Sequence, residues 1–168
     1  MPTALSARDP FSHGYDELIA VLKAHAPLTA AVRVANWISF EGEDPDPKKG
    51  AVLDGDLPEL TIKPAGGPFD LFHSSTSALF KRTFIIGIVT PDKRIDAHMF
   101  KLEWLICCAL YCGYQRLRSI PFVTGIHTTA IETEETDESP EDARRMGGWY
   151  ATMAITLDLV IDRNQFLA

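Results

Sequence analysis

The sequence has little positive charge, few cysteines and no long apolar run, and each shortage argues against a class of protein. Its 16 Lys and Arg against 23 Asp and Glu give a formal net charge of −7 over 168 residues. Because duplex DNA is held through its phosphates by clustered Lys and Arg, this balance disfavours sequence-specific DNA binding. No apolar run approaches the roughly 20 residues that span a bilayer, and residues 1–11 lack the pattern of a signal peptide. We therefore expect a protein of the cytoplasm that makes no membrane contact.

The three cysteines, Cys107, Cys108 and Cys112, lie within six residues and form no CxxC pair. Cysteines in one apolar helix are typical of small buried side chains and not of a disulfide framework. We expect all three to be buried.

Length and composition indicate one globular domain. The chain is 46% hydrophobic and 23% charged, which is close to the ordinary balance of a folded domain. Its length fits a single core. We expect one domain over residues 1–168 with exposed loops at about 41–58, where Asp, Gly and Pro are dense, and at about 134–146.

The apolar spacing predicts an α+β fold, a mostly antiparallel β-sheet packed against one long and one shorter helix. Helical spacing predicts a helix over 15–26 that Pro27 ends, and a main core helix over 96–114 with Gly113 as its stop. The apolar stretch within 28–40 fits either a strand or a short helix.

Strands are predicted at 60–62, 79–90, 122–134 and 149–162. The second half of 79–90 is apolar on both alternating faces, which indicates a central strand covered on both sides. The last strand alternates for longer than the usual 5 to 6 residues, so part of it is available for pairing outside the core. The predicted core packs helix residues Leu102, Ile106, Ala109 and Leu110 against strand residues Ile85, Ile86, Ile88, Ile155, Leu157 and Leu159.

Residue types that catalyse reactions are present, but their spacing matches no known site. The five histidines are scattered: His13, His25, His73, His98 and His127. Asp70, His73, Ser74 and Ser75 lack a nucleophile elbow and are more simply a turn. Asp44 and Asp46 lack the spacing of a calcium loop. We expect no catalytic residue, no metal and no cofactor. A small metal-dependent enzyme using His73 or His127 stays a less favoured alternative.

An acidic run places seven carboxylates within eleven residues, from Glu132 to Asp142. Like-charge repulsion makes such a run costly to bury, so it should face water. It is either a solvated hairpin loop or a negative surface that repels nucleic acid or meets a basic partner. The residues expected in this exposed or channel-facing loop are Glu132, Glu134, Glu135, Asp137 and Glu138.

Two arginines and two aromatic residues precede and begin the last strand: Arg144, Arg145, Trp149 and Tyr150. Arg, Trp and Tyr are enriched at the centres of protein interfaces. We expect these four residues, with Asp44 and Asp46 of an acidic loop, at a contact with another subunit or a partner. The alternative is that Trp149 only begins the core face of its strand.

The order of these elements resembles that of the tail terminator proteins of long-tailed bacteriophages and related tail-like particles. The resemblance covers residues 15–162. It is carried by LPELTI at 57–62, SSTS at 74–77, FKRTFIIGIVT at 80–90, FKLEWLICCALYCG at 100–113 and RRMGGWYATMAITLDLVI at 144–161.

This resemblance implies a structural virion protein that is not an enzyme. Family members form a hexameric ring on the last ring of the tail tube and join the tail to the head. The implied partners are other copies of the chain, the tail tube protein and a head-completion or neck protein, with DNA passing the lumen without specific binding. The implied location is the tail or neck of the virion, after assembly in the host cytoplasm. The long loop at 41–58 departs from the family and leaves open a head-completion or neck-connector role. A monomeric binding module is a further alternative.

Overall fold

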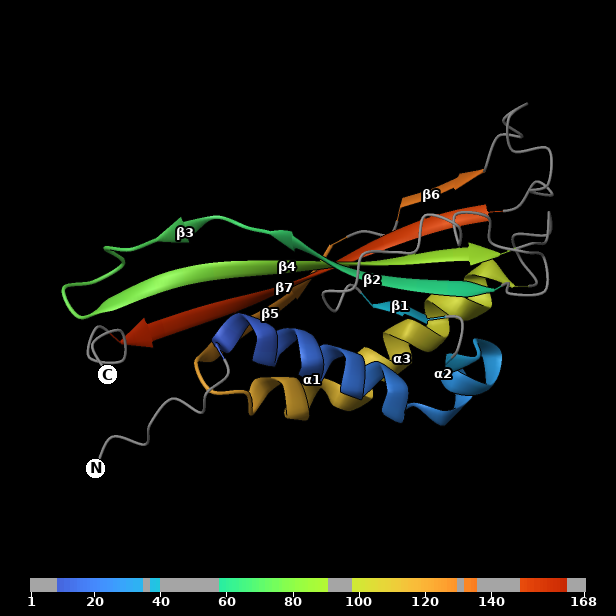
Figure 1. Ribbon diagram of the computed structural model, residues 1–168, viewed down its shortest axis with the longest axis horizontal. Coiled ribbons are helices and arrows are strands. Elements are labelled where there is room, and N and C mark those ends of the chain that lie inside the picture. Colours follow the sequence, from blue (N-terminus) through green and yellow to red (C-terminus); the bar gives the residue numbers. More distant parts are fainter. Residues whose placement is uncertain are drawn as a thin grey trace.

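The computed structural model describes residues 9–34, 37–39, 58–90, 98–129, 132–135 and 149–162. Their fold is α+β, as predicted, with a β-sheet and a layer of helices (Figure 1). The helices are α1 (Pro10–Ala24), α2 (Ala26–Ala31) and α3 (Met99–Arg118). The strands are β1 (Trp37–Ser39), β2 (Glu59–Gly66), β3 (Phe69–Asp70), β4 (Ser77–Thr90), β5 (Val123–Thr128), β6 (Glu132–Glu135) and β7 (Trp149–Asp162).

The centre of the sheet is an antiparallel pair of 14-residue strands, β4 and β7, joined from Ser77 opposite Asp162 to Thr90 opposite Trp149. On the far side of β4 lie β2 and β3, and on the far side of β7 lie β5 and β6. The strand order is β1-β2-β4-β7-β5, and β1 pairs with β2 in parallel. The sheet is therefore mostly antiparallel, with β2 and β3 toward one edge and β5 and β6 at the other.

The period-2 pattern of β7 decides which face of the sheet carries the core. Its buried residues are Ala151, Met153, Ile155, Leu157, Leu159 and Ile161, each alternating with a half-buried or exposed residue. All of them except Ile161 form one hydrophobic cluster with Phe84, Ile86 and Ile88 of β4, and residues of the helices complete this cluster. The predicted core is confirmed except at Ile85, which lies on the other face and is only half-buried.

The expected cover on both faces of β4 is wrong for the part of the chain that the structure describes, because α1, α2 and α3 all lie on one side of the sheet (Figure 1). Figure 1 also shows that the end of the sheet where β3 meets β4 extends past the helical layer.

The N-terminal helix begins earlier and ends sooner than its apolar spacing predicted. Asp9 caps α1 by accepting hydrogen bonds from the N–H groups of Phe11 and Ser12, and Pro10 occupies the first turn. The helix ends at Ala24. Pro27, which we expected only to end it, lies in the first turn of α2, where a missing N–H costs nothing. The open region 28–40 thus contains both candidates, the end of a short helix and the short strand β1.

The long helix continues past its expected stop at Gly113 and ends at Arg118. Gly113 lies where α3 meets α1, and a Cβ there would approach Val21 Cγ1 to 2.1 Å. This glycine therefore permits close packing of two helices and does not terminate one. Next to this contact, Arg116 of α3 donates a hydrogen bond to Glu17 of α1, which lowers the pKa of the Glu17 carboxyl. The pair therefore stabilises the fold at neutral pH, and its contribution is lost as the pH falls through that lowered pKa.

The strand predicted over 122–134 is two strands. β5 pairs with the C-terminal half of β7, and β6 pairs with its first four residues. Between them, the Thr129 N–H donates to the Ala154 carbonyl. The chain therefore follows one edge of β7 but leaves regular pairing after Thr128.

The Ile106 side chain is fully buried at the middle of α3. We predict that Ile106→Ala lowers the free energy of unfolding by about 2–5 kcal/mol, the usual range for a large-to-small core change. Chemical denaturation followed by circular dichroism measures it, and a variant that unfolds like the parent would remove Ile106 from the core.

Gly113→Ala gives a test of the helix contact. Alanine in a helix interior normally stabilises by about 0.5–1 kcal/mol relative to glycine. Here the clash with Val21 should reverse the sign and lower the free energy of unfolding by about 1–3 kcal/mol. Val21→Ala removes both clashing methyl groups. The double variant Gly113→Ala with Val21→Ala should therefore lose less free energy of unfolding than the sum of the two single losses. An alanine that stabilises the protein on its own would contradict the close contact.

Candidate interaction surfaces

A stripe of aromatic side chains runs along the outer face of α3. Its four aromatic residues are Phe100, Trp104, Tyr111 and Tyr114, and Cys107 lies between them; successive positions are four, three, four and three residues apart, and all five face solvent. Trp104 is 68% exposed and Tyr111 85%. This spacing places them on one face of a helix whose other face packs on the sheet. The helix is therefore apolar on two sides, and only one of them is covered by the described residues.

An apolar groove of about 420 Å³ lies between the C-terminal half of α3 and the strands β5 and β7. Its walls come from Leu110, Leu117, Ile126, Met153 and Ile155, with Tyr111 and Tyr114 of the stripe at its α3 side. The core residues Met153 and Ile155 line it at the level where β5 ends at Thr128.

A second exposed apolar surface lies at the turn between β3 and β4. Phe69, Leu71 and Phe72, which we call the hairpin tip, are all exposed, with Phe72 at 89%. The Asp70 carboxylate accepts a hydrogen bond from the Phe72 N–H, which closes the turn locally. Phe69 stacks on Phe80 of β4 with ring centroids 6.3 Å apart. The tip is thus held in place from within the chain.

The hairpin stays close to β4 because of Gly67. A Cβ at Gly67 would lie 1.9 Å from the Lys81 carbonyl oxygen, and its φ of 153° is one that L side chains rarely adopt. Lys81 in turn donates its main-chain N–H to the Pro68 carbonyl. Glycine at this position lets β3 pair with β4 and fixes the direction of the tip.

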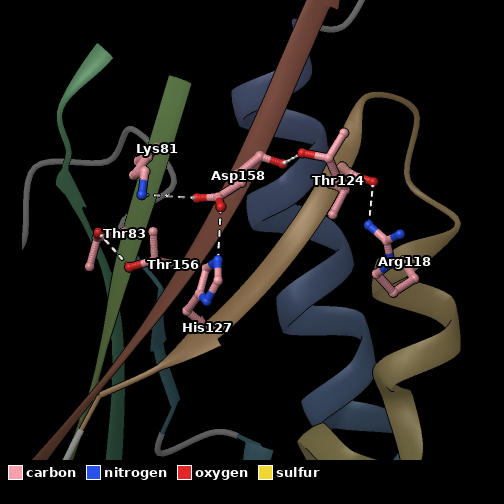
Figure 2. Close-up of polar contacts among 8 residues, drawn as sticks. Lys81, Thr83, Arg118, Thr124, His127, Thr156 and Asp158 are labelled. Carbon is pink, nitrogen blue, oxygen red and sulfur yellow. Dashed lines mark hydrogen bonds and ion pairs between the residues drawn. The ribbon is translucent and has the colours of Figure 1, made fainter. Parts of the chain in front are cut away.

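A polar network joins three strands on the sheet face opposite the helices (Figure 2). The Asp158 carboxylate of β7 lies 2.8 Å from His127 Nε2 of β5 and 3.9 Å from Lys81 Nζ of β4. Beside it, the Thr83 and Thr156 hydroxyls lie 2.9 Å apart across β4 and β7. Gly125 leaves room for the network, because a Cβ there would lie 2.9 Å from Asp158 Oδ2. These contacts tie β5 and β4 to β7 on the face that the helices leave uncovered.

The cysteine prediction is wrong. Cys107 and Cys112 are exposed and Cys108 is half-buried, because all three lie toward the outer side of α3. The helix has apolar residues on both sides, so its composition did not reveal which side is the core. Partial burial, together with Cys108 and the Glu103 carboxylate, raises the pKa of the Cys107 thiol.

The segment with Asp70, His73, Ser74 and Ser75 leads through a turn into β4. Asp70 ends β3, His73 is exposed in the turn, and the Ser74 hydroxyl lies 2.7 Å from that of Ser77. Ser74 thus closes the connection into β4, as the turn interpretation predicted. Of the described residues, no group of three His, Cys, Asp or Glu side chains is placed to hold a metal ion.

The acidic run and the expected interface residues are described only in part. Glu132, Glu134 and Glu135 belong to β6 and pair with the first residues of β7, so the strand includes the first two residues of the loop expected at about 134–146. The main chains of Trp149 and Tyr150 lie in β7 between β4 and β6. The remaining expected site residues, Asp44, Asp46, Asp137, Glu138, Arg144 and Arg145, lie outside the described residues, as do 41–57 of the first expected loop.

The sequence contained signals for the hairpin tip and for the aromatic stripe of α3. The FDLF run at 69–72 places three large apolar side chains in a turn, where they cannot join a core. The aromatic residues of α3 repeat at heptad spacing opposite Leu102 and Ile106, a pattern that predicts a second contact face.

Comparison of the sequence with protein-family models finds no match, and comparison with curated proteins finds none either. Among the helices in the described ranges, none combines the length and hydrophobicity needed to cross a membrane.

Thiol labelling tests the outward orientation of α3. In variants that keep one cysteine, Cys112 should react with a maleimide in the native monomer without denaturant, because its side chain is exposed. Cys107 should react more slowly than Cys112 at neutral pH, because the thiolate is the reactive form and the pKa of the Cys107 thiol is raised. Its reaction should become faster as the pH rises. Protection of Cys112 until global unfolding would contradict the orientation of α3.

Proposed function

We propose that this chain is a structural virion protein of the tail terminator type, whose copies form a ring at the head-proximal end of a phage tail tube and join the tail to the head or neck. The observation that carries the proposal is the aromatic stripe on α3. A helix that packs its core face on the sheet and presents a second row of aromatic side chains to solvent has the pattern of a subunit surface.

The size and composition of the exposed apolar surface are compatible with assembly. A fully exposed aromatic side chain presents roughly 200 Å², so Phe100, Trp104, Tyr111 and Tyr114 together present on the order of 500 Å². The largest apolar patch of a typical monomer is about 300–600 Å² and often has a function, so a surface of this size is compatible with a binding site. Aromatic residues are also the types enriched at energetic centres of interfaces.

The order of the described elements is the one on which the resemblance to tail terminators depends. An N-terminal helix precedes the strand at 59–66, the long strand β4 and the long helix α3, and the last described element is the 14-residue strand β7. A ring subunit of this kind buries one face of its sheet and keeps edges and loops for neighbours.

The charge of the chain is compatible with a channel that DNA passes. A net charge of −7 gives little attraction for phosphates, so DNA would move through a ring of this chain without being held. The partners would be other copies, the tail tube protein and a head-completion or neck protein. A head-completion or neck-connector role uses the same surfaces and is the alternative, distinguished by which partner the ring binds.

Light scattering after size exclusion, with negative-stain microscopy, tests this function. The parent should form rings of one symmetry, and those rings should stop elongation when added to growing tubes of the cognate tail tube protein. Trp104→Glu with Tyr111→Glu should weaken ring formation at least tenfold in concentration while leaving the melting temperature nearly unchanged, because both side chains are exposed. Lys63→Glu, an exposed change on β2, is the control and should leave rings intact.

A parent protein that is monomeric at every concentration would overturn the ring, and rings that bind only head-completion protein would favour the neck-connector role.

A further inference from the structure

The hairpin tip and the groove lie toward opposite edges of the sheet. β4 pairs with β7 along its whole length, so β3 and the hairpin tip lie on the side of β4 away from β7. The groove lies between α3 and β5, which pairs with the other side of β7. The groove is also lined by Met153 and Ile155 of β7, so β4 lies between the tip and the groove, and a tip reaches a groove only on another copy of the chain.

We propose that the hairpin tip of one copy inserts into the groove between α3 and β5 of the next copy. This contact is the subunit interface of the ring proposed above, and the inference therefore rests on that proposed function. Its two sides are different surfaces, so it is head-to-tail, and repeated contacts of this kind close into a ring when the rotation permits.

The dimensions of the two surfaces match. A cavity of about 150 Å³ holds one benzene ring, so a groove of 420 Å³ has room for two phenyl rings. The tip offers Phe69 and Phe72, with Leu71 between them. The groove is lined by aliphatic and aromatic side chains, including Leu110, Leu117 and Ile126, which are suitable walls for phenyl groups.

The area is sufficient for a specific contact. With roughly 200 Å² for a fully exposed aromatic side chain, the exposed parts of Phe69, Leu71, Phe72, Tyr111 and Tyr114 supply on the order of 700 Å² of apolar surface. Since interfaces are about 57% apolar, a contact built on this surface buries roughly 1,200 Å² in total. That value is the lower end of stable, specific interfaces.

The charges beside the two surfaces have opposite signs. Asp70 gives the hairpin tip an exposed carboxylate, and the last turn of α3, which borders the groove at Leu117, carries Arg118 beside Arg116, whose charge is already paired with Glu17 of α1. Arg118 donates to the neutral Val123 carbonyl. Opposite charges at the rim favour this orientation of the two copies over its reverse.

The tip is organised before it binds. Phe69 stacks on Phe80, and Phe80 packs edge-on against Phe11 of α1 with centroids 5.4 Å apart. The turn is closed by its own hydrogen bonds through Asp70 and Ser74. Little conformational entropy is therefore lost when the tip is bound.

Native cysteine chemistry tests the contact directly. Cys107 lines the groove and is exposed, so Phe72→Cys should form a disulfide with Cys107 of the neighbouring copy under mild oxidation. A ladder of crosslinked multimers is expected on non-reducing gels. Phe72→Cys combined with Cys107→Ser is the control and should lose the ladder. Crosslinks that persist in that control, or no crosslink in the first variant, would overturn the proposed contact.

Mixing two defective variants tests its head-to-tail character. Phe72→Asp removes the tip and Tyr111→Glu charges the groove, and both positions are exposed, so the folds should be retained. Each variant alone should be monomeric, and a mixture should form dimers through the one intact tip and groove, without rings. A mixture that stays monomeric would overturn the head-to-tail contact.

The proposed function and this contact fail separately. If the parent forms rings and both Phe72→Asp and Tyr111→Glu still form them, the tip-and-groove contact is overturned and the proposed ring is not. If the Phe72→Cys variant crosslinks to dimers and the parent forms no rings, the contact is supported and the ring is overturned.

Discussion

The full-length pairing of β4 with β7 is the constraint on which the rest of the structure depends. Its register, Thr83 opposite Thr156 and Phe84 opposite Ile155, points every second residue of both strands to the helical side of the sheet and the others to the opposite face. The same pairing leaves β4 one free side for β2 and β3, and β7 one free side for β5 and β6. It thereby decides where the core lies and sends the hairpin tip and the groove to opposite edges.

The long helix connects this architecture to function. Its inner face, with Leu102 and Ile106, completes the core over β4 and β7. Its outer face carries aromatic side chains and the exposed thiols of Cys107 and Cys112. Close packing against α1 at Gly113 fixes the rotation of α3, which determines which residues are left outward. A change at this buried contact therefore also affects the surface that we assign to assembly.

The sequence predicted what depends on local periodicity and missed what depends on neighbours. Alternation in β7 identified its core face, and the α+β class followed from the order of helical and strand patterns. Ile85 was misplaced because β4 is apolar on both faces, and only its partners decide which is covered. Gly113 was taken for a helix stop because its role depends on Val21, which is distant in sequence. The groove has no pattern of its own in the sequence, since it is made by α3, β5 and β7 together.

The central claim is that copies of this chain associate head-to-tail through different surfaces at opposite edges of the sheet. Native mass spectrometry of the purified chain across a dilution series tests it most directly. The account predicts one closed assembly of more than two copies that dissociates to monomer, with open intermediates of successive size. A dimer that never grows would show a symmetric contact in which both copies use the same surface, and it would contradict the account.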